Sequence, residues 1–261
     1  ATGASPRWMQ VFVYKDRCFT REFAERAAAA NYDALVLTID NQLTGTRERD
    51  LRNGFTIPPR FGPSAFAGMA LKLPWLLRMR PELRRITFAN YVERLGAADL
   101  RTIAQRMPSL LDPALSWRDV DSLRSWWRGP FLLKGILHPA DAKEALAHGV
   151  DGIIVSNHGG RQLDGAIASV EALAAVVEAV AGRIPVLLDG GVRRGSDVVI
   201  ALALGARACL IGRPHLWGLA VAGEAGVTQV LDIFRREIDR VMGLCGIARI
   251  AEIGPGLLVR R

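Results

Sequence analysis

A histidine and an arginine stand three residues apart in the segment SNHGGRQLD, which covers residues 156–164. His158 is a candidate general base because an imidazole titrates near neutral pH. Arg161 carries a planar guanidinium that can hold a carboxylate through two parallel hydrogen bonds. A lone histidine is usually structural, but this pair follows an apolar run and is flanked by glycines. The spacing therefore favours a site in which a base acts beside a bound carboxylate.

A glycine-rich turn, DGGVRRG, follows another apolar run. Gly190 and Gly191 let backbone N–H groups approach a ligand, and the N-terminus of the helix expected to start there favours an anion. Arg193 adds positive charge. The next apolar run is followed by Gly212 and Arg213. Two successive loops that both carry glycine and arginine predict a phosphate site, as the last two loops of α/β barrels often do.

Polar side chains also lie at the ends of other apolar runs. Asp40 follows the run that ends at Thr38, and Arg47 comes seven residues after Asp40. Lys134 ends a further run, where a buried ammonium is costly unless it meets an anion or a polar ligand. Asp189 could accept hydrogen bonds from a sugar-like chain next to the phosphate. Because catalytic groups of barrels lie at the C-terminal ends of strands, we expect these side chains to share one site.

Short apolar runs alternate with amphipathic helical patterns along the chain. The expected strands cover residues 9–14, 34–38, 131–134, 152–155, 185–188 and 208–211. The expected helices cover residues 20–30, 140–148, 169–181 and 195–204. Glycine follows three of these helices, at the position that tolerates positive φ, as Gly149, Gly182 and Gly205. Strands that alternate with helices predict a parallel sheet with right-handed crossovers.

We predict an α/β fold, a (β/α)8 TIM barrel formed by residues 1–261 as a single domain. Only six strands are visible, and residues 1–3 resemble the end of a helix and its following loop. We therefore expect the first two βα units to be missing from this chain. An open six-stranded sheet is the alternative.

Residues 60–112 interrupt the repeat and are too long for a simple loop, so we expect an inserted lid-like segment with helices of its own. Its part 65–77 is apolar and is accompanied by a basic cluster that comprises Lys72, Arg78, Arg80, Arg84 and Arg85. This combination is typical of a surface that enters the headgroup region of an anionic membrane. A lid packed over the mouth of the barrel, with a solvated basic rim, is the other interpretation.

Composition excludes several classes of protein. The net charge is +8, but the arginines are spread along the chain without a recognisable nucleic-acid-binding motif, so no nucleic-acid partner is expected. Cys18, Cys209 and Cys245 are too far apart for a C-x-x-C metal site, and their number fits a reducing cytosol. No apolar run is long enough to span a bilayer, and residues 1–7 do not resemble a secretory signal.

Residues 156–164 and 188–195 closely resemble the flavin mononucleotide (FMN)-dependent 2-hydroxy acid oxidase and dehydrogenase family, which includes glycolate oxidase, L-lactate dehydrogenase and mandelate dehydrogenase. The similarity covers nearly the whole chain and is weakest between residues 62 and 112. It implies a (β/α)8 barrel, FMN as the cofactor and two barrel strands that precede the first strand visible here. Family members are commonly tetramers, so the resemblance also implies a homo-oligomer.

The resemblance implies a role for each matching residue. His158 would take a proton from the 2-hydroxy acid, and Asp40 would stabilise the imidazolium that forms. Arg161 and Arg47 would bind the substrate carboxylate. Lys134 would face the flavin ring and stabilise the negative charge that reduction places there. The other implied cofactor contacts, to flavin, ribityl and phosphate, are Gln10, Thr38, Ser156, Asp189, Gly190, Gly191, Val192, Arg193, Gly212 and Arg213.

Phe12 departs from the family pattern, because family members usually have tyrosine at this substrate-facing position. The hydroxyl normally aimed at the substrate is therefore absent. Strand alternation places Gln10, Phe12 and Tyr14 on one face, with Tyr14 about 7 Å further along.

The predicted function is FMN-dependent oxidation of an (S)-2-hydroxy acid, with electrons passing from C2 of the substrate to flavin N5. Oxygen, a quinone or a cytochrome would then accept them, in the cytoplasm or at the cytoplasmic face of a membrane. Two alternatives are open: another FMN barrel, such as an isomerase or nucleotide dehydrogenase, and a truncated or non-catalytic barrel that binds FMN or phosphate without turnover.

Overall fold

Six parallel strands lie side by side in the order in which they occur in the sequence. The structure is a computed structural model that describes residues 6–54, 62–83, 86–96 and 100–259. The strands are β1 (Trp8–Val11), β2 (Ala34–Thr38), β3 (Phe131–Ile136), β4 (Gly152–Val155), β5 (Val186–Leu188) and β6 (Ala208–Cys209). A doubly wound sheet reverses its strand order at a switch point, whereas a barrel does not. The unbroken order therefore indicates a sector of a barrel.

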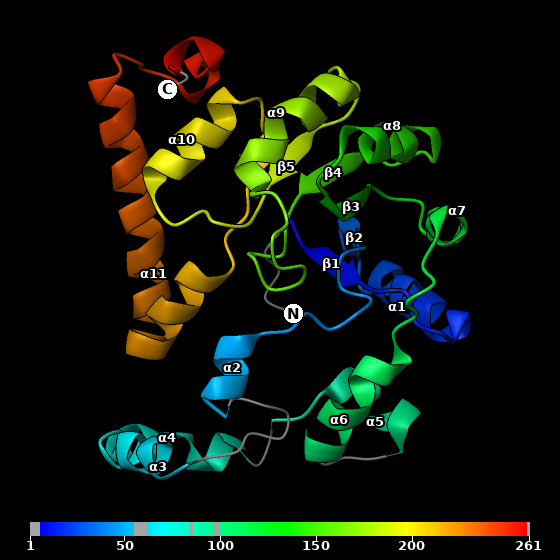
Figure 1. Cartoon of the computed structure of the whole chain (residues 1–261), viewed down its shortest axis with the longest axis vertical. Coiled ribbons are helices and arrows are strands. Elements are labelled where there is room, and N and C mark those ends of the chain that lie inside the picture. Colours follow the sequence, from blue (N-terminus) through cyan, green and yellow to red (C-terminus); the bar gives the residue numbers. More distant parts are fainter. Residues whose placement is uncertain (1–5, 55–61, 84–85, 97–99, 260–261) are drawn as a thin grey trace.

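Helices cover the outer face of this curled sheet (Figure 1). Those that follow β1, β3, β4 and β5 are α1 (Arg17–Ala29), α8 (Pro139–Ala147), α9 (Ser169–Val180) and α10 (Gly195–Ala203). They agree with the four predicted helices to within three residues at each end. Gly149, Gly182 and Gly205 follow the last three with positive φ, as predicted. Two helices without a prediction complete the cover, α7 (Trp117–Trp126) before β3 and α11 (Arg213–Leu244) after β6.

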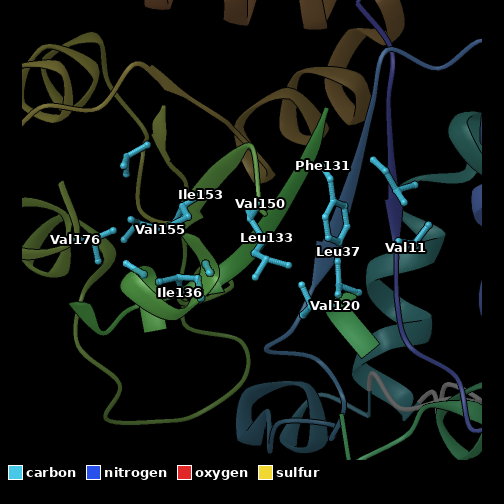
Figure 2. Packing of buried hydrophobic residues seen from close by; sticks show 14 of the residues in the cluster. Val11, Leu37, Val120, Phe131, Leu133, Ile136, Val150, Ile153, Val155 and Val176 are labelled. Atoms are coloured by element: carbon cyan, nitrogen blue, oxygen red, sulfur yellow. The ribbon is translucent and has the colours of Figure 1, made fainter. Parts of the chain in front are cut away.

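The hydrophobic core lies between the sheet and these helices. Leu37, Phe131, Leu133 and Ile153 point outward from their strands into it and are fully buried (Figure 2). The alternate residues of the strands form a smaller cluster on the opposite, inner face, made of Ala34, Val36, Leu132, Ile154 and Leu187. Both faces of β2, β4 and β5 are covered, so these strands are apolar along nearly their whole length, which explains their continuous apolar runs in the sequence.

The first strand is shorter than predicted, because the chain turns away from the sheet after Val11. Tyr14 forms an isolated antiparallel bridge with Leu111 instead. Its ring is buried, stacks on Phe23, and its hydroxyl lies 2.6 Å from that of Tyr91. Burial, together with this hydrogen bond, raises the pKa of Tyr14. The prediction that Tyr14 shares a face with Gln10 is therefore wrong.

The inserted segment contains four helices in its described part, which are α3 (Pro63–Ala70), α4 (Leu73–Leu83), α5 (Ala89–Leu95) and α6 (Leu100–Leu110). A short helix, α2 (Glu48–Arg52), precedes them. Tyr91 of α5 packs on Phe19 and Phe23 of α1, so this half of the insertion is attached to the barrel. Figure 1 shows α3 and α4 set apart from the sheet, beyond α2.

Helix α11 bends sharply inside its 32 residues, where Ala222 and Gly223 have non-helical backbone angles. The first part begins beside the carboxyl edge of the sheet, and the second runs along α10 (Figure 1). Within the described residues, no helix combines the length and apolar character that a membrane span requires.

Candidate active site

A cavity of about 640 Å³ opens at the carboxyl ends of the strands. This volume lies within the range of small-molecule sites, about 300–1,000 Å³. Eleven of the predicted site residues line it, from the strands and from the loops after β4, β5 and β6. They are Gln10, Lys134, His158, Arg161, Asp189, Gly190, Gly191, Val192, Arg193, Gly212 and Arg213.

The five remaining predicted residues are not among those that line this cavity, and four of them bond to a residue that does. Asp40 pairs with His158, Ser156 bonds to Lys134, and Arg47 bonds to the backbone of Arg161. Thr38 accepts a hydrogen bond of 2.6 Å from the amide of Gln10. Phe12 instead packs against the main hydrophobic core.

The imidazole of His158 is held by the loops after β2 and β4 together. Its Nδ1 lies 3.0 Å from Oδ1 of Asp40, and its backbone N–H donates to the hydroxyl of Ser156 at 3.1 Å. An ionised carboxylate only accepts hydrogen bonds, so Nδ1 carries the proton and Nε2 is free to accept one. Gly135 lets the chain approach Asp40 closely, since a Cβ there would lie 2.9 Å from Cγ of Asp40.

Lys134 is nearly buried and meets two partners at the end of β3. Its ammonium donates to the hydroxyl of Ser156 at 2.9 Å and lies 3.3 Å from Oδ2 of Asp189. The pairing offsets the cost of burying the charge. The other carboxylate oxygen, Oδ1 of Asp189, is buried without a hydrogen-bond partner in the described structure. Such an acceptor in a cavity wall suits a hydroxyl group of a ligand.

Arg47 and Arg161 bring two positive charges together from different loops. The Nε of Arg47 donates to the backbone oxygen of Arg161 at 3.3 Å. Two effects lower the pKa of Arg47, first its burial and second the like charge of Arg161. The negative charge of Asp50 raises this pKa and offsets part of the shift. An anion bound between the two guanidinium groups would relieve this repulsion.

The N-terminus of α10 is not open to an anion, contrary to the sequence-based expectation. The N–H groups of Arg193 and Arg194 donate to Oδ2 of Asp197, at 2.8 and 2.9 Å. The N–H of Gly195 donates to the carboxylate of Glu237 at 2.8 Å. The protein's own carboxylates thus cap this helix. What stays available to a phosphate is the turn that precedes it and the side chains of Arg193 and Arg213.

Ten residues that line the cavity were not predicted as site residues, and four of them carry large side chains on β1 or α11, namely Trp8, His215, Leu216 and Trp217. Trp8 lies two residues before Gln10, so strand alternation could have placed it on the same face. The other three belong to the first turn of α11, a helix that no sequence pattern had indicated.

A parallel sheet in sequential strand order, with a charged cavity at its carboxyl edge, defines a protein of the α/β-barrel class that binds its ligand at that edge. The family described as FMN-dependent dehydrogenase matches residues 1–260, and the chain belongs to this family. This confirms the family predicted from the sequence, and with it FMN as the family's cofactor.

Several relatives cover almost the whole chain. An L-lactate oxidase from Nostoc sp. is 45% identical over 97% of this chain, and an L-lactate dehydrogenase from Caulobacter vibrioides is 42% identical over 100%. The chain spans 64% and 68% of these two proteins, respectively. A crystal structure of the monotopic membrane protein (S)-mandelate dehydrogenase superposes with a TM-score of 0.90 at 38% identity, over 100% of this chain and 68% of that one. The predicted barrel fold is thereby confirmed, with six of its strands among the described residues.

The cavity suits FMN in three respects. Asp189 offers a buried acceptor without a partner among the described residues, as the ribityl hydroxyls require. Arg193 and Arg213 supply positive charge for a phosphate at one end. Gln10 and Lys134 place hydrogen-bond donors in the wall for the polar edge of the flavin ring. The residues present therefore fit the cofactor of the family.

Proposed function

We propose that the protein oxidises an (S)-2-hydroxy acid to the 2-oxo acid with FMN as its first electron acceptor. The observation that carries this proposal is the bonded His158–Asp40 pair, whose imidazole shares a cavity wall with Arg161. The names of the relatives, L-lactate oxidase, L-lactate dehydrogenase and (S)-mandelate dehydrogenase, support the same class of substrate.

In this proposal Arg161 and Arg47 bind the substrate carboxylate and orient C2 and its hydroxyl toward His158. Nε2 of His158 accepts a proton, and the carboxylate of Asp40 stabilises the imidazolium that results. When bound, FMN supplies at N5 the acceptor for the two electrons that leave C2. Lys134 keeps a positive charge close to the cofactor, where it stabilises developing negative charge.

Phe12 has no hydroxyl to offer a substrate, and no tyrosine takes its place among the described residues that line the cavity. Tyr14 lies in the aromatic cluster against α1, outside the cavity. We therefore propose that Arg161, Arg47 and His158 bind the substrate without a tyrosine hydroxyl from this strand.

Colour provides the test. Flavin-loaded protein should be yellow, and anaerobic L-lactate or L-mandelate should bleach it within the time of one turnover. D-lactate and acetate serve as controls, because the first has the opposite configuration and the second has no hydroxyl to oxidise. A flavin that binds but is bleached by no 2-hydroxy acid would favour the alternative, a barrel that binds FMN without turnover.

The electron acceptor is proposed to be a quinone, with the protein docked on an anionic membrane through α3 and α4. Five large apolar side chains are exposed there, namely Phe66, Leu71, Leu73, Trp75 and Leu77. Exposed basic residues accompany them, as expected of a membrane-surface helix pair. A packed lid would bury these side chains. The (S)-mandelate dehydrogenase that superposes on this chain is described as monotopic, which supports docking. A homotetramer stays a prediction.

Vesicle binding tests the docking surface. The protein should sediment with vesicles that contain phosphatidylglycerol and less with neutral phosphatidylcholine vesicles. Replacing both Leu71 and Trp75 by glutamate should weaken the binding by at least about tenfold, since each buried side chain contributes about 1.5–3 kcal/mol. Val221→Glu, at an exposed apolar position on α11, is the matched control. Equal binding by both variants would refute this surface.

A further inference from the structure

The side chain of Gln162 joins the loop after β4 to the loop after β2. Its amide nitrogen donates hydrogen bonds to the backbone oxygens of Asp40 and Leu43, both at 2.9 Å. Its amide oxygen accepts a longer hydrogen bond, at 3.5 Å, from the guanidinium of Arg47. A single amide thus contacts three residues of a loop that is more than 100 positions away in the sequence.

The backbones of the two loops are also in close contact at Gly45. A Cβ at this position would lie 2.5 Å from the backbone oxygens of both Arg161 and Gln162, so no side chain fits there. Gly45 therefore sets how closely the loops approach each other. The hydrogen bonds of Gln162 set how they are aligned.

This alignment works against a repulsion, because the two loops carry Arg47 and Arg161. The like charge of Arg161 helps to lower the pKa of Arg47, so the two guanidinium groups interact. A carboxylate at position 162 would neutralise Arg47 and compete with an incoming anion. A neutral amide holds the loops together and leaves both positive charges for a ligand.

We propose that Gln162 is a positioning residue that keeps Arg47 and Arg161 at the separation at which both bind one substrate carboxylate. The inference rests on the proposed function and adds a residue that sets substrate affinity. The proton-transfer pair is aligned by its own hydrogen bond of 3.0 Å between His158 and Asp40. Loss of the Gln162 bridge should therefore weaken carboxylate binding more than it slows reduction at saturating substrate.

The main test compares Gln162→Met, which keeps the length of the side chain, with the wild type, both loaded with FMN. The KM for L-lactate and the dissociation constant of oxalate, measured by calorimetry, should both rise about tenfold to 100-fold, since loss of one hydrogen bond to a charged group weakens binding by a factor of this size. The limiting rate of flavin reduction, the FMN content and the melting temperature should stay close to those of the wild type. Leu163→Ala, at the exposed neighbouring position, should change none of these values.

A second variant separates positioning from general stability. Gln162→Glu keeps the contact with Arg47 but loses the donors to Asp40 and Leu43 and places a competing anion beside the arginines. It should weaken oxalate binding more than Gln162→Met does, because it adds charge competition to the loss of the two donors, and unchanged oxalate affinity in this variant would overturn the proposal even if the methionine variant does not fold.

Unchanged KM and oxalate affinity in these variants would overturn the positioning role. So would a loss confined to the limiting rate with normal oxalate binding. A wild-type flavin that no 2-hydroxy acid bleaches would refute the proposed function instead, and oxalate binding would still test Gln162.

Discussion

Replacing His158 by glutamine should leave FMN bound and slow its reduction by L-lactate by about 10⁴-fold, the upper range for loss of a general base. Glutamine has no basic nitrogen to accept the substrate proton, and its amide does not form the ion pair that Asp40 stabilises. Anaerobic stopped-flow measurement of flavin absorbance gives the rate directly. Reduction at the wild-type rate would remove His158 as the base.

Backbone conformation requires a control for this experiment. His158 has a φ of +57°, a region that asparagine tolerates better than glutamine. His158→Asn should therefore fold at least as well as His158→Gln and show the same loss of rate. Asp40→Asn, which keeps a side chain of the same size but removes its charge, should slow reduction less than either. A loss of FMN from both His158 variants would point to a structural role.

Replacing Arg161 by methionine should lower kcat/KM for L-lactate by about 30-fold to 4,000-fold, because truncating one partner of a buried charge pair costs about 2–5 kcal/mol. Arg161→Lys should recover little of the loss, since an ammonium lacks the planar fork that matches a carboxylate. Arg47→Met should act in the same direction. The double variant should lose less than the product of the two single effects, because both groups are proposed to bind one carboxylate.

Stability distinguishes this role from a structural one. Arg47 and Arg161 repel each other, so removing either charge should leave the melting temperature unchanged or slightly higher. Steady-state kinetics and thermal unfolding of the same preparations measure both effects. If Arg161→Met lowered stability strongly while kcat/KM stayed normal, the arginine pair would have no part in substrate binding.

Local patterns in the sequence predicted the bounds of those strands and helices whose residues are buried in a regular pattern along their whole length. Strands β2 and β4 begin and end where their apolar runs do, because both of their faces are buried. Helix α9 was predicted to within one residue of its end, since an amphipathic pattern and a following glycine mark its length. The insertion was recognised only as a segment, because its helices do not alternate with strands and so lack the βα rhythm that marks the others.

The chemical roles of His158 and Arg161 could be predicted because both residues belong to one loop and are therefore close together in the sequence as well as in the structure. Only the tertiary structure decided which distant groups complete the site. Asp40 reaches His158 across 118 positions, and Gln162 reaches the same loop across 122. Glu237 occupies the helix N-terminus that was expected to bind an anion, and Tyr14 turns into an aromatic cluster formed by α1 and by Tyr91 of the insertion. The sequence by itself determined where the strands lie along the chain and which chemical groups follow them. The tertiary fold decided which residues form hydrogen bonds with these groups. Such a bond depends on which segments the sheet places side by side, and local sequence patterns do not contain that information.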